Sequence, residues 1–183
     1  MNNKTILKQA ESLSASDCYE KIKSQVKKLI SKEEAVLLDK TFLIFNDDEN
    51  SQFVATASFD QSFYEFNEDY QHQIKFNVAT NTDYSYTFIH EFSHIICSHY
   101  NIECTHNLEF AIINYCLRNK VFNNSIQCYF RAYDVHQDKS YPILSINPCQ
   151  FDAFIKCIKW DTLQELVNES KRLAKIIRQK SIN

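Results

Sequence analysis

The chain contains no glycine and only two prolines, Pro142 and Pro148, among its 183 residues. Without glycine there is no glycine-rich loop, so the phosphate-binding loops of nucleotide hydrolases and the dinucleotide-binding fingerprint are both excluded. A stretch of about 18 apolar residues is also missing, and the first residues lack the apolar segment of a signal peptide. We therefore expect a cytoplasmic protein that does not associate with membranes.

Cysteine pairs with a metal-binding or redox spacing are missing as well. The seven cysteines are an odd number, and none of them stands in a Cys-x-x-Cys pair. In a reducing compartment such residues do not form a disulfide framework, so we expect them to pack as small buried hydrophobic side chains. They are Cys18, Cys97, Cys104, Cys116, Cys128, Cys149 and Cys157.

Basic residues are scarce in the middle of the chain. Residues 41–105 carry one Lys or Arg against ten Asp or Glu, although the whole chain carries 20 against 23. A negative field of this kind repels nucleic-acid phosphates and attracts metal ions or cationic peptides. We therefore expect a protein or peptide substrate with a preference for basic segments, and nucleic acid is not favoured as a partner.

The end of the chain is basic instead. The residues concerned are Lys171, Arg172, Lys175, Arg178 and Lys180. We interpret them as the solvated face of an amphipathic helix, because the aromatic residues that accompany nucleic-acid contacts are absent there.

Length and hydrophobic patterning predict one domain of class α+β. The 183 residues, 44% of them apolar, are too few for two ordinary domains. We expect a helical part over residues 1–40, a sheet and metal-site core over 41–120, and a helical part over 121–183. This order of helices, a small sheet and further helices is typical of the α+β class.

Capping residues predict where several helices begin. The signals are Asp17, Ser31 with Glu34, Asn147 before Pro148, and Thr162 with Glu165. A further helix is expected over about residues 124–135.

Alternating apolar residues predict three short strands in the core part. They are expected over residues 42–45, 53–59 and 73–79. An acidic turn separates the first two, so we expect these two strands to form a hairpin.

One helical segment carries a motif with a specific chemistry. The apolar pattern predicts a helix over about residues 84–100, and within it stands His90-Glu-Phe-Ser-His94. Residues four apart lie about 40° apart around a helix, so both imidazoles can bind one ion through nitrogens at about 2.0–2.1 Å. Glu91 lies about 100° from His90, where a general base for a zinc-activated water is needed.

A third ligand is required, because catalytic zinc keeps three protein ligands and one open position. His99 lies five residues after His94, so the helical rotation points it away from the ion. His106 is the better candidate, because eleven residues separate it from His94 and allow the helix to end near Asn101 before a second helix packs back. Glu109, one turn after His106, is the alternative third ligand, and it can otherwise orient a ligand imidazole.

At these residues the chain resembles the SprT-like zinc metallopeptidases, a family of zincin type. The likeness covers about residues 71–118 and rests on the first motif and on His106-Asn-Leu-Glu-Phe110. Asn107 stands where the family usually has glycine, and the zinc ribbon of many members is missing. The resemblance implies a zincin-like fold, a zinc ion held by His90, His94 and His106, and Glu91 as the base.

Together the motif, the spacing and the resemblance predict a zinc-dependent metallopeptidase that hydrolyses peptide bonds in an intracellular protein. A zincin holds its substrate as an added strand, so residues 51–59 or 73–79 are expected to bind it. A tyrosine or histidine that stabilises the oxyanion is also expected, and the tyrosine candidates are Tyr100, Tyr129 and Tyr133.

Two alternatives remain at the level of the sequence. One is a metal-containing binding or regulatory module for a nucleoprotein or a mobile-element partner, without general protease activity. The other is a protease that acts on a single regulator. The alternation of Asp134, His136 and Asp138 is interpreted as a helix end and a solvated turn, and no metal is assigned to it.

Overall fold

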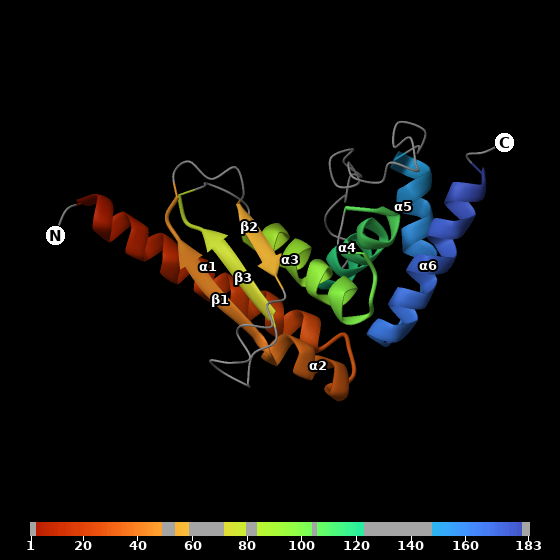
Figure 1. Ribbon diagram of the computed structural model, residues 1–183, viewed down its shortest axis with the longest axis horizontal. Helices are drawn as coiled ribbons and strands as arrows, with labels where there is room; N and C mark the ends of the chain where they lie inside the picture. Colours follow the sequence, from red (N-terminus) through yellow and green to blue (C-terminus); the bar gives the residue numbers. More distant parts are fainter. Residues whose placement is uncertain are drawn as a thin grey trace. The chain divides into compact units, whose positions relative to one another are not determined.

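The computed structural model describes residues 3–48, 54–58, 72–79, 84–103, 106–122 and 148–180 of the chain. Within these residues lie six helices and a three-stranded sheet (Figure 1). The helices are α1 (Asn3–Lys27), α2 (Lys32–Asp39), α3 (Tyr84–His99), α4 (Leu108–Val121), α5 (Pro148–Cys157) and α6 (Leu163–Lys180). The strands are β1 (Thr41–Asn46), β2 (Ala55–Ser58) and β3 (His72–Asn77). The predicted α+β class is confirmed.

The chain divides into two compact units. The first comprises residues 1–28 and 32–95, and the second comprises residues 29–31 and 96–183. The first unit therefore holds α1, α2, the sheet and most of α3, and the second holds α4, α5 and α6. Because the boundary falls inside the continuous helix α3, the single domain expected from the length stays a prediction.

The central strand of the sheet is β3. It pairs in parallel with β1 and antiparallel with β2, so the strand order is β1, β3, β2 (Figure 1). The predicted hairpin between β1 and β2 is therefore wrong. Five of the six β3 positions are buried, whereas β1 and β2 are mostly half-buried or exposed. The strand that is covered on both faces takes the centre, and an acidic turn after β1 does not decide the pairing.

Aromatic side chains fix α3 to the sheet in the first unit. The ring of Phe76 on β3 lies 5.1 Å from Phe88 and 5.2 Å from Tyr84, both on α3. Tyr19 on α1 contacts Phe88 and Phe92 at 5.4 and 5.6 Å, and its hydroxyl donates a hydrogen bond to the carbonyl of Thr41. Large buried aromatic rings with edge-on contacts contribute strongly to a core. This core determines where α3 lies on the sheet.

Helix α4 is the buried centre of the second unit. Nearly all of its residues are buried, and it packs against α5 and α6. Tyr115 meets Phe151 of α5 edge-on at 5.7 Å, and the Lys120 ammonium lies 3.8 Å above the ring of Trp160. The apolar residues that α6 turns inward are buried; they are Leu163, Leu166, Leu173 and Ile177.

The structure confirms two of the predicted helix starts and contradicts a third. Thr162 and Glu165 form the predicted capping box, with Glu165 N donating to Thr162 Oγ1 at 3.1 Å and Thr162 N donating to the Glu165 carboxylate at 3.2 Å. Helix α2 begins directly after Ser31, as predicted. Asp17 is not a cap, because α1 runs through it without interruption. Ala15, Tyr19 and Ile22 are buried at helical spacing through this segment, and this packing outweighs the weak preference of Asp17 for an N-terminus.

The cysteines are only partly buried. Cys97 and Cys116 are buried as expected, whereas Cys18 is half-buried and Cys157 is exposed at the end of α5, so the expectation is wrong for Cys157. None of the described helices is long and apolar enough to cross a membrane. Several predictions lie outside the described residues; they concern Cys104, Cys128, the Cys149 side chain, Asn147, the helix over 124–135 and the group Asp134, His136 and Asp138.

Candidate metal centre

Helix α3 presents two different faces at the motif. Phe88, Phe92 and Ile95 are buried in the core, whereas His90 and His94 are half-buried on the other side. The apolar positions are spaced three and four residues apart, so they form a stripe that turns the two histidines away from the core. The sequence therefore places both imidazoles side by side, one helical turn apart.

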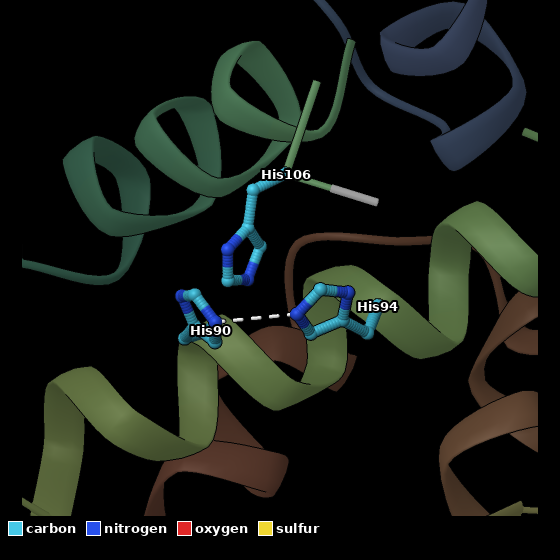
Figure 2. Close-up of side chains that lie close together, drawn as sticks. All are labelled: His90, His94 and His106. Atoms are coloured by element: carbon cyan, nitrogen blue, oxygen red, sulfur yellow. Dashed lines mark hydrogen bonds between the residues drawn. The ribbon is translucent and has the colours of Figure 1, made fainter. Parts of the chain in front are cut away.

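The two imidazoles of α3 point their Nε2 atoms at each other. The Nε2 atoms of His90 and His94 lie 3.2 Å apart, and the ring centroids are 4.9 Å apart with planes inclined by 78° (Figure 2). Two nitrogens at about 2.0–2.1 Å from one tetrahedral zinc ion would be separated by about 3.3 Å. The observed separation suits a shared ion, and it also suits the direct hydrogen bond drawn in Figure 2.

His106 completes the cluster from the segment before α4. Figure 2 shows its ring directed at the pair on α3. One ligand atom from each of His90, His94 and His106 lies within 4.8 Å of the others, and no other such group of His, Cys, Asp or Glu occurs among the described residues. The three predicted ligands are therefore brought together.

The first turn of α4 holds the His106 ring in place. His106 directly precedes Asn107, the N-cap, whose side-chain oxygen accepts a hydrogen bond of 2.9 Å from Phe110 N. The His106 ring packs on Phe110 with a centroid distance of 5.0 Å. A side chain before the cap that packs on the first turn fixes the direction in which the chain enters the helix. Asn107, which replaces the glycine of the resembled family, thus has a structural role of its own.

A tight turn ends α3 and directs the chain back toward His106. The helix ends near Asn101 as expected, and Asn101 has a φ of 52°, a left-handed conformation that asparagine can adopt in place of glycine. Asn101 N donates to the Ser98 carbonyl at 3.2 Å, and Ile102 N donates to the Cys97 carbonyl at 2.8 Å. These two bonds form a Schellman motif, and both Ile102 and Cys97 are buried, as is usual for it.

Glu91 lies on the buried edge of α3, next in sequence to the first histidine. It is 4% exposed, and its Oε2 has no hydrogen-bond partner among the described residues. Burial raises the pKa of Glu91 from 4.5 to about 8, although a hydrogen bond from the backbone of Ala57 on β2 lowers it. A buried carboxyl group that keeps one unsatisfied oxygen is available for a ligand or a reaction.

The donor set suits zinc. Three imidazole nitrogens with room for one further ligand are the usual protein ligands of a catalytic zinc ion, and hard cations such as Mg²⁺ prefer oxygen ligands. All three histidines are half-buried, so the cluster is neither sealed in the core nor fully solvated. A zinc ion fits these residues by chemistry and by the spacing of the nitrogens.

The remaining sequence candidates lie elsewhere. Glu109, the alternative ligand, is not in the cluster; both of its carboxylate oxygens accept hydrogen bonds from Arg178 of α6, at 2.5 and 2.7 Å. His99 is exposed, in agreement with its predicted direction, and its ring meets the half-buried Tyr100 at 4.9 Å. The other two oxyanion candidates, Tyr129 and Tyr133, lie outside the described residues.

Two contacts around the cluster were not expected from the sequence. The hydrogen bond from Ala57 comes from a backbone group, which no residue pattern can indicate. Arg178 was interpreted as part of a solvated basic face, but its partner on α4 shields it. Its position next to the buried Ile177 is the one local signal that it lies near the inner side of α6.

No known protein family, curated protein or solved structure matches the chain. The likeness to SprT-like metallopeptidases therefore rests on the two motifs alone.

Proposed function

We propose that this protein is a zinc-dependent metallopeptidase of SprT-like type. The observation that carries the proposal is the convergence of His90, His94 and His106, whose ligand atoms lie within 4.8 Å of one another. The buried and partly unsatisfied carboxyl group of Glu91 beside them supplies the second requirement, a proton acceptor, because the charge of a bound zinc ion favours the ionised form that burial alone disfavours.

Each residue of the centre has a distinct task in this proposal. The three histidines hold the ion through neutral imidazole nitrogens and leave a fourth position for water or substrate. When bound, zinc lowers the pKa of a coordinated water toward about 7 and polarises a carbonyl. Glu91 removes a proton from the attacking water and delivers it to the departing amine, so the peptide bond breaks with no net change in its own charge.

The sheet supports a particular way of binding substrate. In the described part of the chain, β3 has neighbours on both sides, whereas β2 pairs only with β3. Glu91 accepts its backbone hydrogen bond from Ala57, so β2 is the strand beside the proposed base. An extended peptide that pairs with the free edge of β2 would therefore lie next to the histidines. Of the two expected strands, β2 is the one we propose.

The first test is metal content. Elemental analysis of the purified full chain is expected to give about one zinc per molecule, lost on substituting His94→Ala or His106→Ala. His99→Ala is the matched control, because it removes an exposed histidine from the same helix and leaves the zinc in place. Zinc that persists in the His106→Ala variant would contradict the three-histidine centre.

The second test separates an enzyme from a metal-containing binding module. Cleavage of a library of peptides is compared for the parent chain and the Glu91→Gln variant, both loaded with zinc. The proposal expects cleavage to fall at least 100-fold in the variant while the zinc content stays the same, because general-base catalysis contributes about 10²–10⁴-fold. Intact zinc without cleavage by the parent chain would favour the binding module.

A further inference from the structure

The ion pair between Arg178 and Glu109 joins two helices next to the metal centre. Arg178 Nη1 lies 2.5 Å from Glu109 Oε1, and Nη2 lies 2.7 Å from Oε2. The two residues are 69 positions apart in the chain, and their side chains are 32% and 14% exposed. A guanidinium that binds both oxygens of a carboxylate defines direction as well as distance.

A second arginine on α6 shows what an ordinary surface pair looks like here. Arg172 contacts Glu169 three residues earlier on the same helix, and its side chain is 59% exposed. Such a pair constrains nothing beyond its own helix and contributes little in water. The Arg178 pair differs in linking α6 to α4 and in being largely shielded from water.

Glu109 stands in the one turn of α4 that positions the third histidine. It is the second residue after the N-cap Asn107, in a first turn that also contains Phe110, on which the His106 ring packs. The ends of helices are the parts that open most readily. A bidentate link from α6 to this turn opposes that opening, and a carboxylate near a helix N-terminus is itself favourable.

We propose that Arg178 is a positioning residue for the metal centre, because through Glu109 it fixes the first turn of α4 and with it His106. The inference rests on the proposed function, since it assigns His106 as a ligand.

The test is a double-mutant cycle on the full chain, read by metal binding rather than by peptidase activity. Zinc affinity is measured by competition with a chelator for the parent chain, Arg178→Gln, Glu109→Gln and the double variant. Each single variant is expected to bind zinc about 10-fold or more weakly, as when a residue that orients a ligand is lost. The double variant is expected to be no weaker than either single one, because both remove the same interaction.

Two controls separate positioning from general loss of stability. Arg172→Gln removes an arginine of the same helix, and its zinc affinity is expected to stay within about twofold of the parent. Ile155→Val loosens α5 in the same unit without touching the pair, and it is also expected to keep its affinity. Arg178→Lys retains the charge but not the two-point contact, so its affinity is expected to lie between those of the parent and Arg178→Gln.

The visible spectrum of the cobalt-substituted protein supplies a readout that stability alone does not change. Its bands are expected to shift in Arg178→Gln and to stay unchanged in Arg172→Gln. Parent-like affinity in both Arg178→Gln and Glu109→Gln would overturn the inference, as would an equal loss in Ile155→Val. If Arg178→Gln does not fold, the zinc affinity of Glu109→Gln decides whether the inference holds. A parent chain that binds no zinc would instead overturn the proposed metal centre, and the inference with it.

Discussion

A single carboxyl group shows the conflict between folding and the proposed chemistry most clearly. Glu91 is buried, and among the described residues one of its carboxyl oxygens has no hydrogen-bond partner, although most of the buried side chains of α3 are apolar. A buried group of this kind costs stability unless it is neutral or paired. Natural proteins retain such residues where a reaction needs them, so stability is sacrificed at the site of function.

We expect Glu91→Gln to stabilise the metal-free protein at alkaline pH. Because the folded pKa of about 8 lies above the ordinary value of 4.5, the stability linked to this group is complete below about pH 4.5 and is lost as the pH rises toward 8. Glutamine keeps the shape and cannot ionise, so the free energy of unfolding is expected to rise by about 1–3 kcal/mol at pH 8. Urea unfolding in the presence of EDTA measures it.

The pH dependence is the decisive part of that prediction. The gain is expected to be small at pH 5, because this pH lies close to the ordinary pKa of 4.5 and little of the pH-dependent loss of stability in the parent chain has accumulated there. Glu103→Gln is the matched control, because this carboxylate is exposed and its replacement should change stability by less than about 0.5 kcal/mol. An equal gain from Glu91→Gln at both pH values would contradict the assigned protonation.

At the scale of elements, a left-handed asparagine takes the place of the missing glycine. Asn101 ends α3 with a φ of 52° and completes the Schellman motif that leads toward His106. Asparagine enters this region at less cost than most residues, and alanine enters it only with strain.

Asn101→Ala is therefore expected to lower the free energy of unfolding by about 1 kcal/mol, whereas Asn101→Gly is expected to leave it unchanged or raise it. The Asn101→Ala variant is also expected to bind zinc more weakly, because the turn sets the course of the chain between His94 and His106. Urea denaturation and chelator competition measure the two effects. An alanine variant as stable as the glycine variant would show that the turn does not depend on this conformation.

Local signals predicted helix boundaries well and strand pairing poorly. The hydrogen bonds of the capping box of Thr162 and Glu165 lie within one helical turn, so the box can be recognised in the sequence. The parallel pairing of β1 with β3 joins Thr41 to His72, and no turn residue between them specifies it. Burial on both faces of β3 decides the order, and that depends on which helices cover the sheet.

Across the whole molecule, part of the candidate site could be predicted from the sequence and part of it could not. His90, His94 and His106 were predicted because helical geometry and a short connection bring them together, and the structure places their ligand atoms within 4.8 Å. The contact between Glu109 and Arg178 was not predicted, because it joins positions 69 residues apart without a motif. Contacts between residues close in sequence can be predicted from their spacing along a helix. Contacts between residues far apart in sequence can be identified only once the complete fold is known.

Zinc is expected to stabilise the folded chain as a whole. At a free concentration about 100 times the Kd, binding to the folded state alone adds about 2.7 kcal/mol to the free energy of unfolding. Thermal unfolding with zinc and with EDTA measures the shift, which is expected to disappear in His94→Ala and to persist in His99→Ala. A parent chain with the same Tm in both conditions would contradict a zinc site in the folded state.

The distance in sequence between Glu109 and Arg178 has a consequence for the order of synthesis. A ribosome adds about 5–20 residues per second, so the 69 positions between the two residues correspond to about 3–14 seconds. All three histidines are already made when this interval begins. If the proposed zinc site forms, a nascent chain can therefore bind the ion before the arginine that pairs with Glu109 has been added.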